Sequence, residues 1–107
     1  MKTFEEYQAL ATKVPLSLRN NRERIQLPAL GIQEESGKIG LLLAKAFESG
    51  RSGLTQEQSI ELEDRLSDTL WYVALLCGEA GIGMQEIAKH SIERLEARSR
   101  GLDPDRR

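Results

Sequence analysis

Charged side chains recur at helical spacing in two separate segments of the sequence. Glu35 and Lys38 stand three positions apart, and so do Arg65 and Asp68. Side chains three positions apart lie on one face of a helix, so each pair points in a common direction. Carboxylates on facing helices of a bundle can hold a divalent metal ion, whereas arginine suits contact with phosphate. The alternative is a set of ordinary salt bridges at the margins of amphipathic helices.

The residues around Glu35 and Lys38 fit an amphipathic helix. At about 100° per residue, an apolar stripe forms from Ile32, Ile39, Leu43 and Ala46. Glu35 and Lys38 fall beside that stripe, whereas Glu34 falls near the opposite side of the helix. We therefore expect Glu35 and Lys38 to edge the core and Glu34 to face water.

The residues around Arg65 and Asp68 fit a second helix of the same kind. Its apolar stripe consists of Leu62, Leu66, Leu70, Val73 and Cys77. A polar column beside the stripe holds Glu61, Arg65, Asp68 and Tyr72. After Asp68 the segment is apolar on nearly all sides, which predicts that it is buried against a second subunit.

Two shorter segments at the start of the chain must lead into these helices. Thr3 predicts an N-cap for a first helix that continues to Val14 and is stopped by Pro15. Residues 16–28 have the composition of a polar connector that ends at Pro28. The helix that carries Glu35 is then expected to begin at about Ala29 or Gly31 and to end at Phe47.

The second half of the chain contains two further helix signals. Thr55 and Gln58 have the spacing of a capping box, and the helix that follows should end at Gly78 or Gly81. A last helix is expected from Met84 to Ser99. Strand alternation is absent, so the predicted fold class is all-α. We expect one four-helix domain over residues 1–100 and a frayed tail over residues 101–107.

Composition excludes several classes of protein. Apolar residues make up 39% of the chain, with 17 acidic and 15 basic residues, so the chain is too apolar and too balanced for disorder. A net charge of −2 argues against a nucleic-acid partner or an anionic membrane surface. Cys77 is the single cysteine, which excludes an internal disulfide.

The sequence shows no recognisable targeting signal. The longest apolar run, Leu70–Cys77, is far shorter than the roughly 20 residues that a bilayer requires. No signal peptide is readable at the N-terminus, where Glu5 and Glu6 follow within the first residues. We therefore expect a cytoplasmic protein without a membrane-spanning segment.

Four segments in order resemble the MazG-type nucleoside triphosphate pyrophosphohydrolases. They are FEEYQ at positions 4–8, LGIQEESG at 30–37, DRLSDTLWYVA at 64–74 and IERLEAR at 92–98. The resemblance covers about residues 3–98. It implies an all-α protein that forms a homodimer or homotetramer through a helical bundle.

The resemblance also implies a reaction and a metal ion. Members of this family hold Mg²⁺ with a Glu-x-x-Glu on one helix and a Glu-x-x-Asp on the next, and split a nucleoside triphosphate into monophosphate and pyrophosphate. Mg²⁺, or Mn²⁺ in its place, neutralises the phosphates, and a carboxylate can orient the attacking water. Glu35 and Asp68 match two of the four acidic positions and are the candidate catalytic residues and metal ligands.

The chain departs from the family pattern at the other two acidic positions. Lys38 and Arg65 stand where the family has glutamate, so the four positions sum to zero charge without a metal ion. Glu61 is a candidate third ligand, although it lies one turn before the family position. The family's nucleotide-contacting asparagine aligns with Ser91, and Trp71 and Arg94 are further candidates for contact with the substrate.

Three hypotheses follow. The first is a pyrophosphohydrolase with a reduced ligand set of Glu35, Glu61 and Asp68. The second is a non-catalytic relative that binds a nucleotide or another small phosphorylated ligand through Lys38 and Arg65. The third is a helical oligomerisation module whose charged column is purely structural.

Overall fold

The computed structural model describes residues 3–14, 20–48, 50 and 52–102, and within them every regular element is a helix. The helices are α1 (Phe4–Ala11), α2 (Asn21–Glu48), α3 (Gln56–Ala80) and α4 (Met84–Ser99). The predicted all-α class and the four helices are confirmed. None of the helices in this part of the chain is long and apolar enough to cross a membrane.

Side-chain caps set the starts of α1 and α3. The Thr3 hydroxyl accepts a hydrogen bond from the Glu6 amide at 3.1 Å. At α3, Thr55 Oγ1 accepts from the Gln58 amide at 3.1 Å, and the Gln58 side chain accepts from the Thr55 amide at 2.9 Å. The predicted capping box is therefore confirmed. α1 ends earlier than expected, at Ala11, and α3 ends where Gly81 adopts a left-handed φ of 73°.

The start of α2 differs from the prediction. The helix begins at Asn21 and includes Pro28, so much of the expected connector is helical. Asn20 Oδ1 accepts a hydrogen bond from the Glu23 amide at 2.9 Å and starts the helix. Proline inside a helix removes one backbone hydrogen bond. The Pro28 ring is fully buried, and this burial offsets part of that cost.

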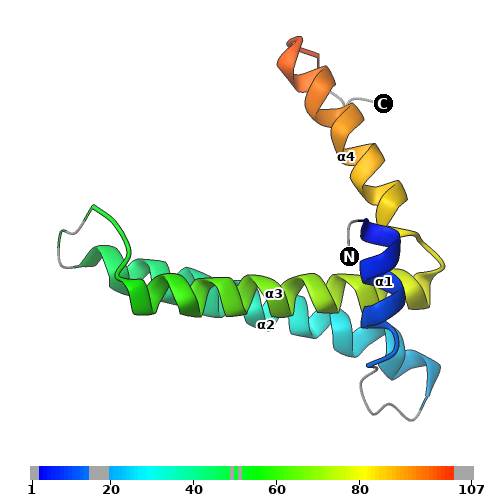
Figure 1. Cartoon of the computed structure of the whole chain (residues 1–107), viewed down its shortest axis with the longest axis horizontal. Coiled ribbons are helices and arrows are strands. Elements are labelled where there is room, and N and C mark those ends of the chain that lie inside the picture. The colour runs from blue at the N-terminus through cyan, green and yellow to red at the C-terminus, as the bar shows by residue number, and fades with distance from the viewer. Residues whose placement is uncertain (1–2, 15–19, 49, 51, 103–107) are drawn as a thin grey trace.

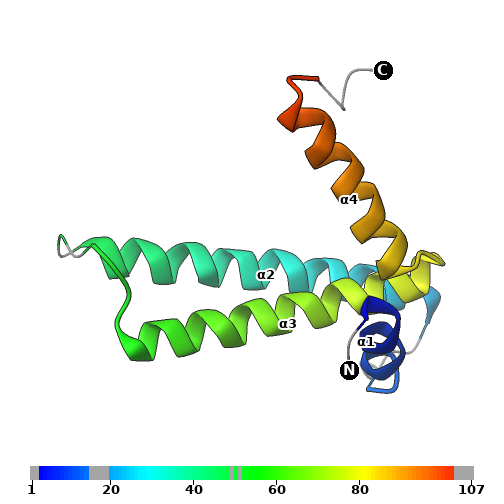
Figure 2. The same cartoon turned by 45° about the horizontal axis from the view of Figure 1, so that its top comes forward.

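α2 and α3 form a long antiparallel hairpin that dominates the shape of the molecule (Figures 1 and 2). α1 packs across the C-terminal part of α3, and α4 leads away from the hairpin. The Cα radius of gyration is 16.7 Å. A compact domain of this length has a radius of about 13 Å, so the chain is extended for its size.

The hydrophobic core lies where α1, α3 and the start of α4 meet. Its buried members are Ala11, Ala74, Cys77 and Met84, against which Tyr7, Trp71 and Val73 pack. Large apolar side chains remain exposed along α3 and α4, among them Leu66, Ile92 and Leu95, each more than half exposed. The single chain therefore buries only part of its apolar surface.

One side chain of α1 fixes the start of α4. Gly83 precedes α4 and offers no side-chain cap. The Gln8 side chain supplies one instead, because its Oε1 accepts from the Met84 amide at 2.9 Å. Its Nε2 donates to the Ile82 carbonyl at 3.0 Å. Gln8 thus holds both the turn before α4 and the first residue of the helix.

At its other end, α4 is closed by its own backbone. Gly101 adopts a left-handed φ of 75°, and the Leu102 amide donates to the Ala97 carbonyl at 2.9 Å. Residues 103–107, which carry most of the expected frayed tail, lie outside the described residues.

Candidate functional site

The two predicted charged pairs meet across the α2–α3 hairpin. Arg65 Nη1 lies 3.2 Å from Glu35 Oε2 and 3.3 Å from Glu35 Oε1, so one guanidinium nitrogen donates to both carboxylate oxygens. Glu35 is the one buried charged residue in the described part of the chain, with 4% of its surface exposed. A buried carboxylate needs such a partner, because burial of an isolated charge is costly.

Lys38 and Asp68 lie at the two sides of this central pair. Lys38 Nζ is 3.0 Å from Glu34 Oε1 and 3.8 Å from Glu35 Oε1. Asp68 Oδ2 is 4.0 Å from Arg65 Nη1. We refer to Glu34, Glu35, Lys38, Arg65 and Asp68 as the charge cluster. Its three carboxylates and two cations give a net charge of −1.

Glu34 has a role that the helical wheel alone does not show. Its side chain is 63% exposed, as expected, yet it is the nearest carboxylate to Lys38. The hydrogen bond from Lys38, together with the negative charge of Glu34, raises the pKa of the Lys38 ammonium. Lys38 therefore stays protonated at neutral pH. The i to i+4 spacing of Glu34 and Lys38 is the sequence signal for this pair.

The side chains as they stand do not fit a magnesium ion. Arg65 donates to both oxygens of Glu35, and its positive charge would repel a magnesium ion bound at that carboxylate. Glu61 lines a pocket of about 160 Å³ together with Lys38 and Lys45. In the residues that the structure describes, no three His, Cys, Asp or Glu side chains form a group that could hold a metal ion.

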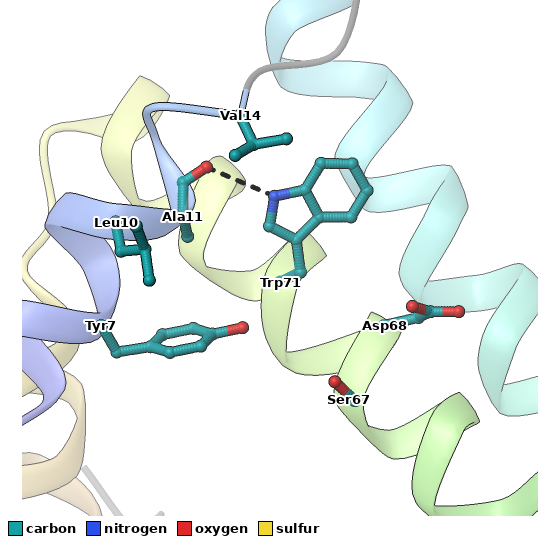
Figure 3. Close-up of a pocket in the computed structure, with 7 residues that line it drawn as sticks. All are labelled: Tyr7, Leu10, Ala11, Val14, Ser67, Asp68 and Trp71. Carbon is teal, nitrogen blue, oxygen red and sulfur yellow. Dashed lines mark hydrogen bonds between the residues drawn. The ribbon is translucent and has the colours of Figure 1, made fainter. Parts of the chain in front are cut away.

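An open pocket lies next to the charge cluster, between α1 and α3 (Figure 3). Its volume is about 370 Å³, and it is lined by Tyr7, Leu10, Ala11, Val14, Ser67, Asp68 and Trp71. We call it the α1–α3 pocket. Trp71 Nε1 donates to the Ala11 carbonyl at 3.3 Å, which fixes the indole ring against α1. Asp68 belongs to both the pocket and the charge cluster, so it connects the two.

The remaining predicted residues lie on α4. Ser91 lines a smaller apolar pocket of about 170 Å³ with Phe4, Leu70, Val73, Met84, Ile87 and Ala88. Arg94 lies one turn further along α4 and is half-buried. The residues lining Ser91's pocket include no member of the charge cluster. The structure therefore joins Glu35, Lys38, Arg65 and Asp68, places Trp71 beside them, and leaves Ser91 in separate surroundings.

The sequence reasoning missed the contribution of α1 to this region. Tyr7, Leu10 and Val14 carry no sequence signal of a site, yet they form one wall of the α1–α3 pocket. Burial, followed by the negative charge of Asp68, raises the pKa of the Tyr7 phenol. The phenol therefore keeps its proton at neutral pH and remains a hydrogen-bond donor.

Comparison with known proteins gives one distant relative. The chain is 25% identical over 76 residues to the Gene 37 protein of Mycobacterium phage L5, covering 71% of this chain and 67% of that protein. No family model matches the sequence. No solved structure matches it either.

Proposed function

We propose that the chain is a MazG-like protein of the nucleoside triphosphate pyrophosphohydrolase family in which the magnesium-dependent activity has been lost. The position of Arg65 carries this proposal. Its guanidinium lies within 3.3 Å of both Glu35 oxygens and 4.0 Å from Asp68, the two residues that match the family's acidic positions.

The energetics of the charge cluster support the loss of the ion. A divalent cation would have to separate Arg65 from Glu35 and would meet the positive charge of Lys38 as well. The ion would have to displace Arg65 from the nearly buried Glu35 carboxylate before binding to it, a cost that free acidic ligands do not impose. Arg65 and Lys38 thus neutralise the negative charge of the carboxylates, which a metal ion would otherwise neutralise.

A phosphate site on Lys38 and Arg65 is less well supported. Both cations are already paired with carboxylates, and the cluster has a net charge of −1. A triphosphate would therefore approach a surface that repels it. The binding of a phosphorylated ligand through these two residues is the weaker alternative.

Pyrophosphate release tests the proposal. We expect no release by the wild-type protein from a panel of nucleoside and deoxynucleoside triphosphates with Mg²⁺ or Mn²⁺. We expect release by the double variant Lys38→Glu with Arg65→Glu, and its loss when Asp68→Ala is added. Electron paramagnetic resonance of bound Mn²⁺ provides a second measurement that does not depend on turnover.

A matched control distinguishes the effect of these two positions from the effect of the change in net charge. The double variant Lys13→Glu with Lys89→Glu makes the same change in net charge at two exposed positions. It is expected to bind no Mn²⁺ and to release no pyrophosphate. Metal-dependent release by the wild-type protein that Asp68→Ala abolishes would show that the proposal is wrong.

Self-association is a second proposed property, and the apolar surface of α4 favours it. Ile92 and Leu95 are 54% and 56% exposed on a helix that packs chiefly against α1. Exposed apolar side chains gathered on one element mark an interaction surface. A second copy of the chain, as a homodimer or homotetramer, would cover this surface.

A further inference from the structure

One face of α3 and one face of α4 carry residues at matching intervals. Counted back from the C-terminal end of the helix, the α3 series is Cys77, Val73, Leu70, Leu66 and Glu63. Counted forward from the first residue of the helix, the α4 series is Met84, Ala88, Ser91, Leu95 and Arg98. Both series advance by steps of four, three, four and three residues, the spacing that keeps side chains along one side of paired helices. If the helices ran antiparallel, the two series would therefore meet layer by layer, and we call this pairing the α3–α4 seam.

The layers nearest the connection between the two helices are already formed. Cys77 and Met84 are each 5% exposed and belong to the same buried core cluster. The next two layers line one apolar pocket of about 170 Å³, with Val73 and Leu70 on α3 and Ala88 and Ser91 on α4. The register of the seam is thus set within the single chain.

Further from the connection the two helices separate (Figures 1 and 2). Leu66 is 52% exposed and Leu95 is 56% exposed, although the register places them opposite each other. In the next layer the register places Glu63 opposite Arg98, both at exposed positions. A leucine facing a leucine and a carboxylate facing a guanidinium are complementary pairs between helices. The two faces therefore match beyond the point at which they part.

The connection between α3 and α4 has the length and composition of a hinge. It consists of Gly81, Ile82 and Gly83, and connections of two to five residues join antiparallel helices. A few loop residues of this kind can absorb the backbone change that a closing helix requires. Gln8 bonds to Ile82 and Met84, on either side of the second glycine, so it holds the hinge at its present angle.

We propose that α4 is a hinged arm that closes onto α3 of the same chain along the α3–α4 seam. The same chain is the occupant that the register favours, because closure extends layers that already join its own α3 and α4. α3 would then lie between α2 and α4, and Leu66 and Leu95 would be covered. Since Leu95 also belongs to the surface proposed for self-association, a closed arm would withhold that surface from a second copy. The inference goes beyond the proposed function and requires neither a metal ion nor a nucleotide.

Disulfide formation across an outer layer tests the closure. The double variant Glu63→Cys with Arg98→Cys brings two thiols together only when the arm is closed, because a disulfide needs Cα atoms about 4.4–6.8 Å apart. The native Cys77 is buried. We expect a disulfide between positions 63 and 98 of one chain under mild oxidation at low protein concentration. Mass spectrometry of tryptic fragments and the mass of the unreduced protein identify it.

A second double variant, Glu63→Cys with Glu96→Cys, is the matched control. Glu96 is exposed and stands two positions nearer the hinge than Arg98, yet it lies on the far side of α4 from the seam. Its disulfide with position 63 is expected to form at least about 10-fold more slowly, because the two Cα atoms do not come within bonding range.

Two further substitutions, each added to the Glu63→Cys with Arg98→Cys protein, test the role of the apolar layer. Leu66→Glu places a charge in the middle of the seam and is expected to slow the disulfide about 10-fold. Ile60→Glu adds the same charge at a residue of α3 that is 54% exposed and lies outside the seam, so the rate should not change. Circular dichroism of each variant checks that the helices are intact.

Four results would overturn the inference. They are no disulfide between positions 63 and 98 within one chain, an equal rate with position 96, a rate that Leu66→Glu leaves unchanged, and a disulfide that links two chains. The last result would mean that α4 of a second copy occupies the seam. All four are independent of pyrophosphate release, so failure here would leave the proposed loss of activity standing.

Discussion

At the scale of single residues, the contact between Gly31 and Tyr72 sets how closely α2 and α3 approach. Gly31 is buried, and a Cβ atom placed on it would lie 2.7 Å from three atoms of the Tyr72 ring. No side chain fits in that space unless the ring moves. The centroids of the Tyr72 and Trp71 rings are 5.2 Å apart. Because Trp71 lines the α1–α3 pocket, a shift of the Tyr72 ring would also move a wall of that pocket.

Gly31→Ala is therefore expected to destabilise the protein. An added methyl group in a filled space costs about 1–3 kcal/mol, and the midpoint of thermal unfolding should fall accordingly. Circular dichroism during heating measures the change.

Gly40→Ala is the matched control for this substitution. Gly40 lies in the same helix, and nothing approaches within 4 Å of its added Cβ. Alanine there should stabilise the helix by about 0.5–1 kcal/mol. If Gly31→Ala raised stability as much as Gly40→Ala does, the close approach of Tyr72 would be refuted.

Residue patterns predicted part of the charge cluster, but not which cation contacts which carboxylate. The wheel placed Glu35, Lys38, Arg65 and Asp68 beside the core, and the structure brings them together. It did not indicate which of the two cations pairs with Glu35, since that depends on the register between two helices. Nor did it reveal the bond between Lys38 and Glu34, because Glu34 was assigned to solvent by its angle alone.

At the scale of helices, local sequence signals predicted where helices start, but they did not predict that Pro28 lies inside a helix. Thr3 and Thr55 mark helix starts as expected, because their caps depend on residues close in sequence. α4 also starts at Met84 as expected, although its cap comes from the distant Gln8. The sequence predicted that the helix starts after Pro28. In the structure Asn20 caps α2 ahead of Pro28, and the Pro28 ring is buried inside the helix. The α1–α3 pocket was not predictable, since it forms only where α1 crosses α3.

The orientation of α4 should depend on Gln8. Gln8→Ala removes the bonds to Ile82 and Met84, and leaves the first turn of α4 without a side-chain cap. Loss of a cap costs about 1 kcal/mol. We expect faster amide hydrogen exchange in the first turn of α4, measured by mass spectrometry, with α2 unchanged.

Gln85→Ala serves as the control for this effect. It removes the same side chain from an exposed position within α4 itself. Exchange in the first turn should stay at the wild-type rate. Equal acceleration by both variants would mean that Gln8 does not hold the helix.

At the scale of the whole molecule, the extended shape bears on assembly. A radius of gyration of 16.7 Å and an α4 that leads away from the hairpin leave apolar side chains uncovered. The sequence indicated a subunit interface from the apolar second half of α3. In the structure Ala74, Leu75 and Cys77 of that segment are buried within the single chain, and the exposed apolar residues extend onto α4.

Leu95→Glu is expected to weaken the proposed self-association. A charge in the centre of an apolar contact is costly to bury, so the variant should sediment at a smaller mass than the wild-type protein. Analytical ultracentrifugation over a range of concentrations measures this. Gln85→Glu adds the same charge on an exposed, polar position of α4 and should leave the mass unchanged. A wild-type protein that is monomeric at every concentration would contradict the expectation.

The contacts of Gln8 also bear on the order in which the chain folds. Gln8 bonds to Ile82 and Met84, which are separated from it by 74 and 76 residues along the chain, whereas α2 and α3 pair across one short connection. Contacts between distant positions form late, because the entropy of closing a long loop must be overcome first. The hairpin is therefore the natural folding nucleus, and the docking of α1 onto the start of α4 is the step that closes the chain on itself.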